Sequence, residues 1–161
     1  MNPIGELLHL QDIRLDVDVS SKAELLERLA DLLARHGVSR ADILASLTER
    51  ERLGSTGLGH GVAIPHARMK QLRTPVGAFV RTRIPVPFDA PDGRPVSSAL
   101  ALLVPAEATD KHLKLMASAA SLFGDRAFRQ QLRQSVQPSE VEALFVDWSD
   151  AGEASSERGP Q

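Results

Sequence analysis

Residues 50–66 read Arg50-Glu-Arg-Leu-Gly-Ser-Thr-Gly-Leu-Gly-His-Gly-Val-Ala-Ile-Pro-His66. Four glycines lie within eight residues of this stretch, a density that a regular helix does not tolerate. The apolar residues 62–64 then lead to Pro65, which favours extended backbone in the residue before it. We therefore expect a glycine loop followed by the end of a strand, with His66 just beyond that strand.

Helical patterns precede the glycine loop. Ser21 and Glu24 have the spacing of a capping box, in which a hydroxyl and a carboxylate cap the same helix start. Ser39 can cap a second helix, which is predicted to run to about Arg52. A short strand is expected ahead of both helices, over residues 13–19. The buried stripe of the first helix is predicted from leucines at helical spacing, at 25, 26, 29, 32 and 33.

Strand and helix patterns follow the glycine loop. Residues 76–82 and 98–104 are predicted strands, and the second is apolar enough to be covered on both faces. The segment between them contains four prolines, which predict extended backbone and a turn. Helices on both sides of a group of buried strands indicate an α/β layer fold. Three helices are predicted after the strands. The first is capped at Thr109 or Asp110, and the second begins after Gly124-Asp125. The third is capped by Ser139 together with Glu142.

The last residues differ from the rest of the chain. Residues 150–161 contain no large apolar side chain, so burial cannot offset the entropy lost on ordering them. We therefore expect a single folded domain over residues 1–149 and a disordered tail over residues 150–161.

Composition excludes several classes of protein. The chain has 161 residues, no cysteine and a formal net charge of -2. The absence of cysteine excludes a disulfide framework, a Cys-ligated zinc and a thiol nucleophile, and the near-neutral charge argues against nucleic-acid binding. The longest strongly apolar run, residues 99–105, is too short to cross a bilayer, and the N-terminus has no secretory leader pattern. We expect a cytoplasmic protein without stable membrane insertion.

No aspartate or glutamate occurs between Arg52 and Phe88. The same window holds six basic residues, the glycine cluster and two histidines, a combination that favours an anion site. A solvated basic face would give the same pattern. Within the loop, Ser55, Thr56 and Gly57 are candidates for contacting phosphoryl oxygens, and ordinary turn residues are the alternative interpretation.

Two histidines are candidates for chemistry. His66 follows a proline at a strand end, which holds it rigidly, and a neutral imidazole is a competent nucleophile toward phosphorus. His112 lies in the first turn of a predicted helix, where the helix dipole disfavours its protonated form and attracts an anion. A structural or surface histidine is the alternative at each position. His60 is interpreted as a turn residue, and no carboxylate at ligand spacing supports a zinc site formed by the three histidines.

The stretch 50–66 is similar to the signature of the enzyme IIA proteins of the bacterial phosphoenolpyruvate-dependent phosphotransferase system, of the mannitol/fructose type. It resembles most the nitrogen-regulatory members of that family. The resemblance implies a mixed β-sheet with helices packed on both faces. It extends from about Ile4 to Trp148 and includes the motifs Phe88-Asp-Ala and Thr-Asp-Lys-His112-Leu. The sequence departs from the family at three positions. His60 stands where glycine or asparagine is more usual, Ala67 where glycine is more usual, and Arg68 where lysine is more usual.

The resemblance implies roles for three residues. His66 matches the histidine that accepts the phosphoryl group, and His112 matches the second active-site histidine, which contacts that group. Arg50 matches the arginine that assists in the site, where a guanidinium can fork onto phosphoryl oxygens. In-line transfer between two histidines depends on positioning and electrostatics, so no cofactor or metal is expected.

Three functions remain open from the sequence. The first is a phosphorelay protein that takes its phosphoryl group from an HPr-type phosphocarrier and regulates partners according to its phosphorylation state. The resemblance implies targets such as sensor kinases or potassium transporters in nitrogen or potassium metabolism. The second is a sugar-specific enzyme IIA that serves a fructose or mannitol enzyme IIB. The third is a binding module without phosphotransfer, against which the presence of Arg50, His66 and His112 argues.

Overall fold

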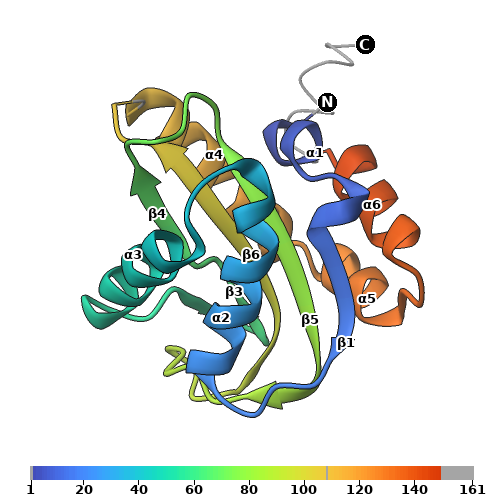
Figure 1. Cartoon of the computed structure of the whole chain (residues 1–161). Coiled ribbons are helices and arrows are strands. Elements are labelled where there is room, and N and C mark those ends of the chain that lie inside the picture. The colour runs from blue at the N-terminus through green and yellow to red at the C-terminus, as the bar shows by residue number, and fades with distance from the viewer. Residues whose placement is uncertain (1, 108, 150–161) are drawn as a thin grey trace, which may run out of the picture.

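A six-stranded mixed sheet runs through the centre of the computed structural model, with helices on both of its faces (Figure 1). The structure describes residues 2–107 and 109–149, so the tail expected over 150–161 lies outside the described residues. The α/β fold class predicted from the sequence is confirmed. The strands are β1 (Ile13–Val17), β2 (Gly57–Gly59), β3 (Val62–Ala63), β4 (His66–Met69), β5 (Val76–Val86) and β6 (Val96–Pro105).

The strand β6 organises the sheet because it pairs with three others. It is antiparallel to β5 and parallel to both β3 and β4. Strand β1 pairs with the other edge of β5 and runs parallel to it. Both faces of β6 are covered, which explains the near-continuous apolar sequence of this strand. The register His66↔Leu102 fixes the start of β4 beside the middle of β6.

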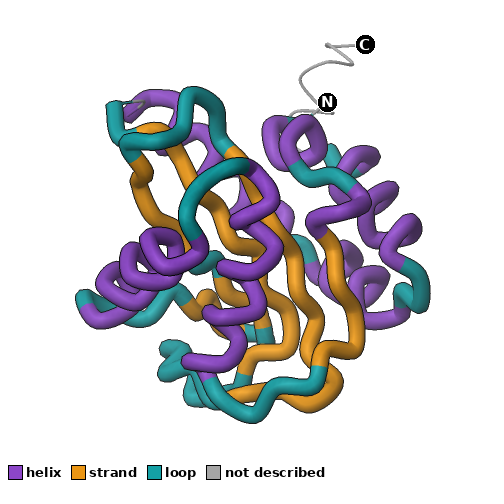
Figure 2. Tube along the Cα trace, in the orientation of Figure 1, coloured by secondary structure: helices purple, strands orange, loops and turns teal. Residues whose placement is uncertain are grey.

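Two hydrophobic clusters pack against opposite faces of the sheet. One contains Ala99, Ala101 and Leu103 of β6 together with α2 and α3, and the other contains the alternate residues of β6 with α1, α4, α5 and α6. Figure 2 shows the strands side by side with the helical layers around them. The helices are α1 (Pro3–Leu7), α2 (Lys22–Leu33), α3 (Arg40–Arg52), α4 (Thr109–Gly124), α5 (Arg126–Gln134) and α6 (Pro138–Asp147).

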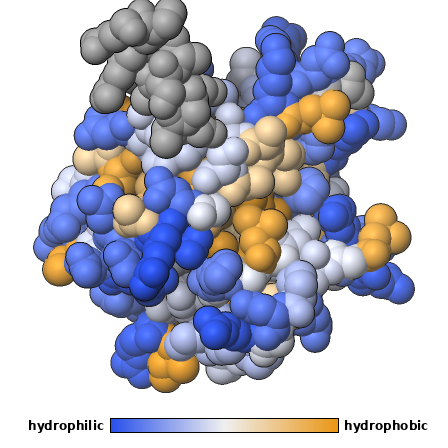
Figure 3. Space-filling model, turned by 180° about the vertical axis from the view of Figure 1, so that it is seen from behind, coloured by the Kyte–Doolittle hydropathy of each residue, from blue (hydrophilic) through white to orange (hydrophobic). Residues whose placement is uncertain are grey.

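Burial removes most large apolar side chains from the surface. Among the described residues few stay exposed, and the view from behind shows hydrophobic areas among hydrophilic residues (Figure 3). Two of the most exposed are Leu53, at 80%, which directly follows α3, and Leu113, at 65%, which follows His112 near the start of α4.

The structure corrects several boundaries predicted from the sequence. Helix α1 has no counterpart in the prediction, and it forms because the Asn2 side chain caps it by accepting a hydrogen bond from the Gly5 amide. The strand predicted before His66 is β3, which ends at Ala63, and His66 also begins the next strand because β4 pairs with β6. Strand β5 continues to Val86 through the proline-containing segment. Helix α6 begins earlier than predicted, because Gln137 and Glu140 form its capping box.

Candidate functional site

The backbone brings His66 and His112 together. His66 is held at the first position of β4, where the carbonyl of the preceding Pro65 accepts a 2.9 Å hydrogen bond from the Leu102 amide of β6. His112 lies in the first turn of α4. Their ring centroids are 5.9 Å apart, with the rings tilted by 47°. Two histidines separated by 46 positions in the sequence therefore lie near each other in the fold.

A backbone carbonyl selects the tautomer of His66. Nδ1 of His66 lies 2.9 Å from the Ile64 carbonyl oxygen, which can only accept a hydrogen bond. Nδ1 therefore carries the proton, and the lone pair of the neutral ring lies on Nε2. The ring is half-buried, and this burial lowers the pKa of His66, assisted by the charge of Arg50 and opposed by the hydrogen bond to Ile64. The neutral, nucleophilic form is thus favoured.

His112 is also held in its neutral form. Burial lowers its pKa, and the Arg68 guanidinium and the neighbouring His66 ring lower it further. Its Nδ1 atom is buried and has no hydrogen-bond partner within the described part of the chain. A buried ring nitrogen without a partner is unusual in proteins, and it marks His112 as a side chain with unused hydrogen-bonding capacity.

An open cavity of about 690 Å³ contains both rings. We call it the His66 cavity. Its charged lining is mainly basic, from Arg50 and Arg68, and its acidic member Glu49 lies 3.4 Å from the Arg52 guanidinium. Arg50 is oriented by the loop that follows its helix, because its Nη1 donates a 2.8 Å hydrogen bond to the Gly54 carbonyl. The cavity can accept a small anion beside the His66 ring.

The three loop candidates lie outside the lining of the cavity. The Ser55 hydroxyl donates a 2.7 Å hydrogen bond to the Phe88 carbonyl, and the Thr56 hydroxyl donates to the Glu51 carboxylate. Gly57 permits a close approach, since a Cβ there would lie 2.8 Å from the Ala90 Cβ. These residues shape the loop that follows Arg50.

His60 is likewise outside the His66 cavity. It is exposed and adopts a positive φ of 56°, and its backbone amide donates a 2.9 Å hydrogen bond to Asp92. The structure thus places it in the turn expected from the sequence. No group of three or more metal-ligating side chains occurs among the described residues.

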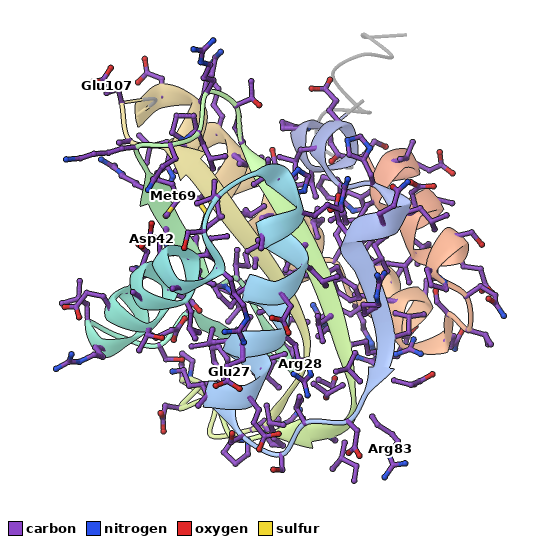
Figure 4. The ribbon with its side chains drawn as sticks, in the orientation of Figure 1. Glu27, Arg28, Asp42, Met69, Arg83 and Glu107 are labelled. Atoms are coloured by element: carbon purple, nitrogen blue, oxygen red, sulfur yellow. The ribbon has the colours of Figure 1, made fainter. Side chains whose placement is uncertain are left out.

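Sequence reasoning did not single out Arg68 or Leu53 as site residues, although both line the His66 cavity. Strand alternation could have indicated Arg68, because it lies two residues after His66 on β4 and such residues point to the same face of a strand. The other basic residues of the acid-free window are scattered. Arg81 donates to the carbonyls of Leu132 and Ser135, and Arg83 lies at the far end of the molecule from Met69 on β4 (Figure 4).

Residues 6–147 match the family described as "Phosphoenolpyruvate-dependent sugar phosphotransferase system, EIIA 2". The chain belongs to this family. This enzyme IIA protein is 38% identical over 134 residues to a "Nitrogen regulatory protein" of Pseudomonas aeruginosa, covering 82% of this chain and 87% of the relative. No helix in the described part of the chain is long and apolar enough to cross a membrane.

Solved structures agree with this assignment. The crystal structure of nitrogen regulatory protein IIA-Ntr from Neisseria meningitidis superimposes with a TM-score of 0.85 and 47% identity, covering 88% of this chain and 98% of that one. The mannitol IIA protein of Escherichia coli gives a TM-score of 0.73 at 18% identity, covering 86% of this chain and 98% of that one. At that identity the likeness shows the shared fold.

Proposed function

We propose that this enzyme IIA protein accepts a phosphoryl group on Nε2 of His66 from a phosphohistidine of an HPr-type carrier, in a cytoplasmic phosphorelay. The observation that carries this proposal is the hydrogen bond between Nδ1 of His66 and the Ile64 carbonyl. It leaves Nε2 as the nucleophile, in a basic cavity that also contains His112. The domain that performs this reaction is proposed to span residues 1–149.

The transfer balances without an added reactant. The Nε2 lone pair of His66 attacks phosphorus, an N–P bond forms, and the N–P bond of the donor breaks with its electron pair returning to the donor imidazole. As the His66 ring gains positive character, its Nδ1 proton stays hydrogen-bonded to Ile64, and that bond strengthens. The ring therefore needs no separate base.

The basic groups of the cavity supply charge stabilisation. Phosphoryl transfer spreads negative charge over three equatorial oxygens, so catalysis consists mainly of positioning and electrostatic stabilisation. Arg50 offers a planar fork of donors, and Arg68 adds a second guanidinium from the same strand as His66. His112 is proposed to donate a hydrogen bond to a phosphoryl oxygen. Ser55, Thr56 and Gly57 are proposed to support this site by holding the loop.

We further propose that the phosphorylation state of His66 regulates partner proteins, such as sensor kinases or potassium transporters. The similar proteins from Pseudomonas aeruginosa and Neisseria meningitidis are both named nitrogen regulatory proteins, which supports a nitrogen-regulatory role. Phosphorylation replaces the basic cavity by a surface carrying a dianionic group, which changes the partners that fit beside the exposed Leu53.

A sugar-specific role is the second candidate, because the family is described by its sugar phosphotransferase system. The two roles differ in where the phosphoryl group goes. Rapid loss of phosphate from His66 to a fructose or mannitol enzyme IIB would favour the sugar-specific role. Retention of phosphate in the presence of such an enzyme IIB would favour the regulatory one.

Intact-mass measurement tests the proposal. The protein is incubated with phosphoenolpyruvate, enzyme I and an HPr-type carrier, as wild type, as His66→Ala and as the matched control His60→Asn. A single acid-labile phosphoryl adduct is expected in the wild type and the control and not in His66→Ala. Absence of an adduct in wild type, with the carrier shown to be phosphorylated, would leave the binding-module interpretation.

A further inference from the structure

A second cavity, of about 580 Å³, shares no lining residue with the His66 cavity. We call it the α1–α4 pocket. It lies between α1, the start of β5 and the first turns of α4. Its apolar wall is formed by Pro3, Leu7, Pro75, Val76 and Leu115. A pocket of this size with a mostly apolar wall is typical of small-molecule sites.

Tertiary contacts fix the wall of this pocket. The Asn2 side chain ties the start of α1 to the end of α6 by donating hydrogen bonds of 2.7 Å to the Phe145 carbonyl and 2.9 Å to the Trp148 carbonyl. Gly77 allows Leu7 to sit directly on β5, since a Cβ at Gly77 would lie 2.6 Å from the Leu7 Cδ1. The apolar wall is therefore in place before any ligand arrives.

Lysines at the rim give the pocket its positive charge. Lys111 and Lys114 are both exposed, and neither forms an ion pair within the described residues. They lie three residues apart on α4, and so they occupy the same side of the helix as Leu115. An anionic group at the rim can meet both ammonium groups while an apolar group contacts the wall.

The other polar lining residues limit the choice of ligand. His36 is already engaged, because its Nε2 lies 2.9 Å from the Asp12 carboxylate, which the Arg35 guanidinium also contacts at 2.8 Å. Glu6 contributes the one carboxylate of the lining, and His9 and Thr74 are its remaining polar members. Two lysines against one glutamate leave a small net positive charge, which favours a ligand with one carboxylate over one with two or three.

We propose that the α1–α4 pocket binds a small monocarboxylate with an aliphatic or aromatic body. The carboxylate pairs with Lys111 and Lys114, and the body packs against Leu7, Val76 and Leu115. Because Lys111 directly precedes His112, the ligand restrains the turn of α4 that carries the second histidine of the His66 cavity. The effect of this restraint on phosphoryl transfer rests on the proposed function, whereas binding of the monocarboxylate does not.

The test uses 4-phenylbutyrate as the probe, with the full chain and no phosphoryl donor. Amide and imidazole signals are followed by NMR during the titration. We expect saturable shifts of Leu7, Val76 and Leu115, accompanied by a shift of the His112 ring signals. The neutral analogue 4-phenylbutan-1-ol should bind more weakly, because it cannot pair with the lysines.

Lysine variants test the charge pairing. Lys111→Gln and Lys114→Gln should each weaken binding about 2- to 5-fold, the range for an exposed ion pair, while Lys70→Gln outside the pocket should not. Absence of saturable shifts, equal binding of the alcohol, or shifts confined to the His66 cavity would overturn the proposal. Shifts that follow protein concentration instead of probe concentration would assign the pocket to a contact between copies of the chain, which also overturns it.

The pocket proposal and the proposed function can fail independently of each other. If the wild type takes no phosphate but binds the probe, only the relay is wrong. If phosphate transfer proceeds but the probe shows no saturable binding, only the pocket assignment is wrong. If the probe binds without moving the His112 signals, the coupling through α4 is wrong.

Discussion

Glu51 links the end of α3 to the glycine loop, because its carboxylate accepts hydrogen bonds from both the amide and the hydroxyl of Thr56. The same carboxylate forms a 2.8 Å salt bridge with Lys22, the first residue of α2. The Glu51 side chain is only 4% exposed. The residue beside the proposed phosphoryl-stabilising Arg50 is thus an internal anchor that fixes where α3 ends.

Replacing this anchor should loosen the loop. In Glu51→Gln the charge that balances Lys22 is lost, and a buried amide group faces donors that it satisfies only in part. We expect a loss of about 1–3 kcal/mol in the free energy of unfolding, measured by urea denaturation. The exposed Glu49→Gln provides the matched comparison and should stay within about 0.5 kcal/mol of wild type. Equal effects in the two variants would contradict the anchoring role.

The two histidines of the candidate site could be proposed from the sequence because the signals around them are local. Pro65 fixes the backbone before His66, and a helix start accompanies His112. The pairing of β4 with β6 is not local, so the sequence did not predict that His66 begins a strand. For the same reason the sequence could not show that the hydroxyls of Ser55 and Thr56 turn inward to distant or buried partners.

Helix α1 illustrates a second limit. Its five residues are too few to show a helical period, and its Asn2 cap is held by Phe145, 143 positions away. Only the folded chain brings these residues together. The α1–α4 pocket depends on this helix, and consequently no sequence pattern indicated it.

His112 is expected to affect the rate of phosphoryl transfer to His66 and not the final extent of phosphorylation. Removing a hydrogen-bond donor to developing charge costs roughly 2–4 kcal/mol of transition-state stabilisation, a slowing of about 30- to 1,000-fold. His112→Ala should therefore still reach the phosphorylated state, but slowly, in rapid-quench measurements with the phosphorylated carrier. His60→Asn, which changes a histidine outside the cavity, should keep the wild-type rate. A wild-type rate in His112→Ala would remove His112 from the mechanism.

The lowered pKa of His66 predicts a particular pH dependence. Its folded value lies below the ordinary 6.5, chiefly because of burial. Acceptance needs the neutral ring, so the rate should stay constant down through pH 6.5 and fall only near the lower folded value, which ring NMR signals report directly. A rate that falls with a midpoint at or above 6.5 would contradict the burial argument.

The lowered pKa of His66 also affects the free energy of unfolding of the protein. Between the folded pKa and 6.5 the unfolded chain binds a proton that the folded chain does not, so the unfolding free energy should decrease as the pH falls through this window. Above 6.5 both states are neutral at this residue and its contribution is constant. His66→Gln should reduce the pH dependence of the unfolding free energy in this window, as measured by urea denaturation, and the lowered pKa of His112 accounts for the part that remains.

Gly57 supports the loop through its lack of a side chain. A Cβ there would lie 2.8 Å from the Ala90 Cβ and 3.1 Å from its Cα, so Gly57→Ala forces the glycine loop away from the segment that follows β5. Overpacking of this kind typically costs about 1–3 kcal/mol, and we expect a loss of that size in urea denaturation. Gly124→Ala is the control, because no atom beyond its chain neighbours and the backbone of its own helix lies within 4 Å of its added Cβ. Since the displaced loop follows the end of α3, which carries Arg50, Gly57→Ala should also slow phosphoryl acceptance. A stable, fully active variant would show that the loop does not position the arginine.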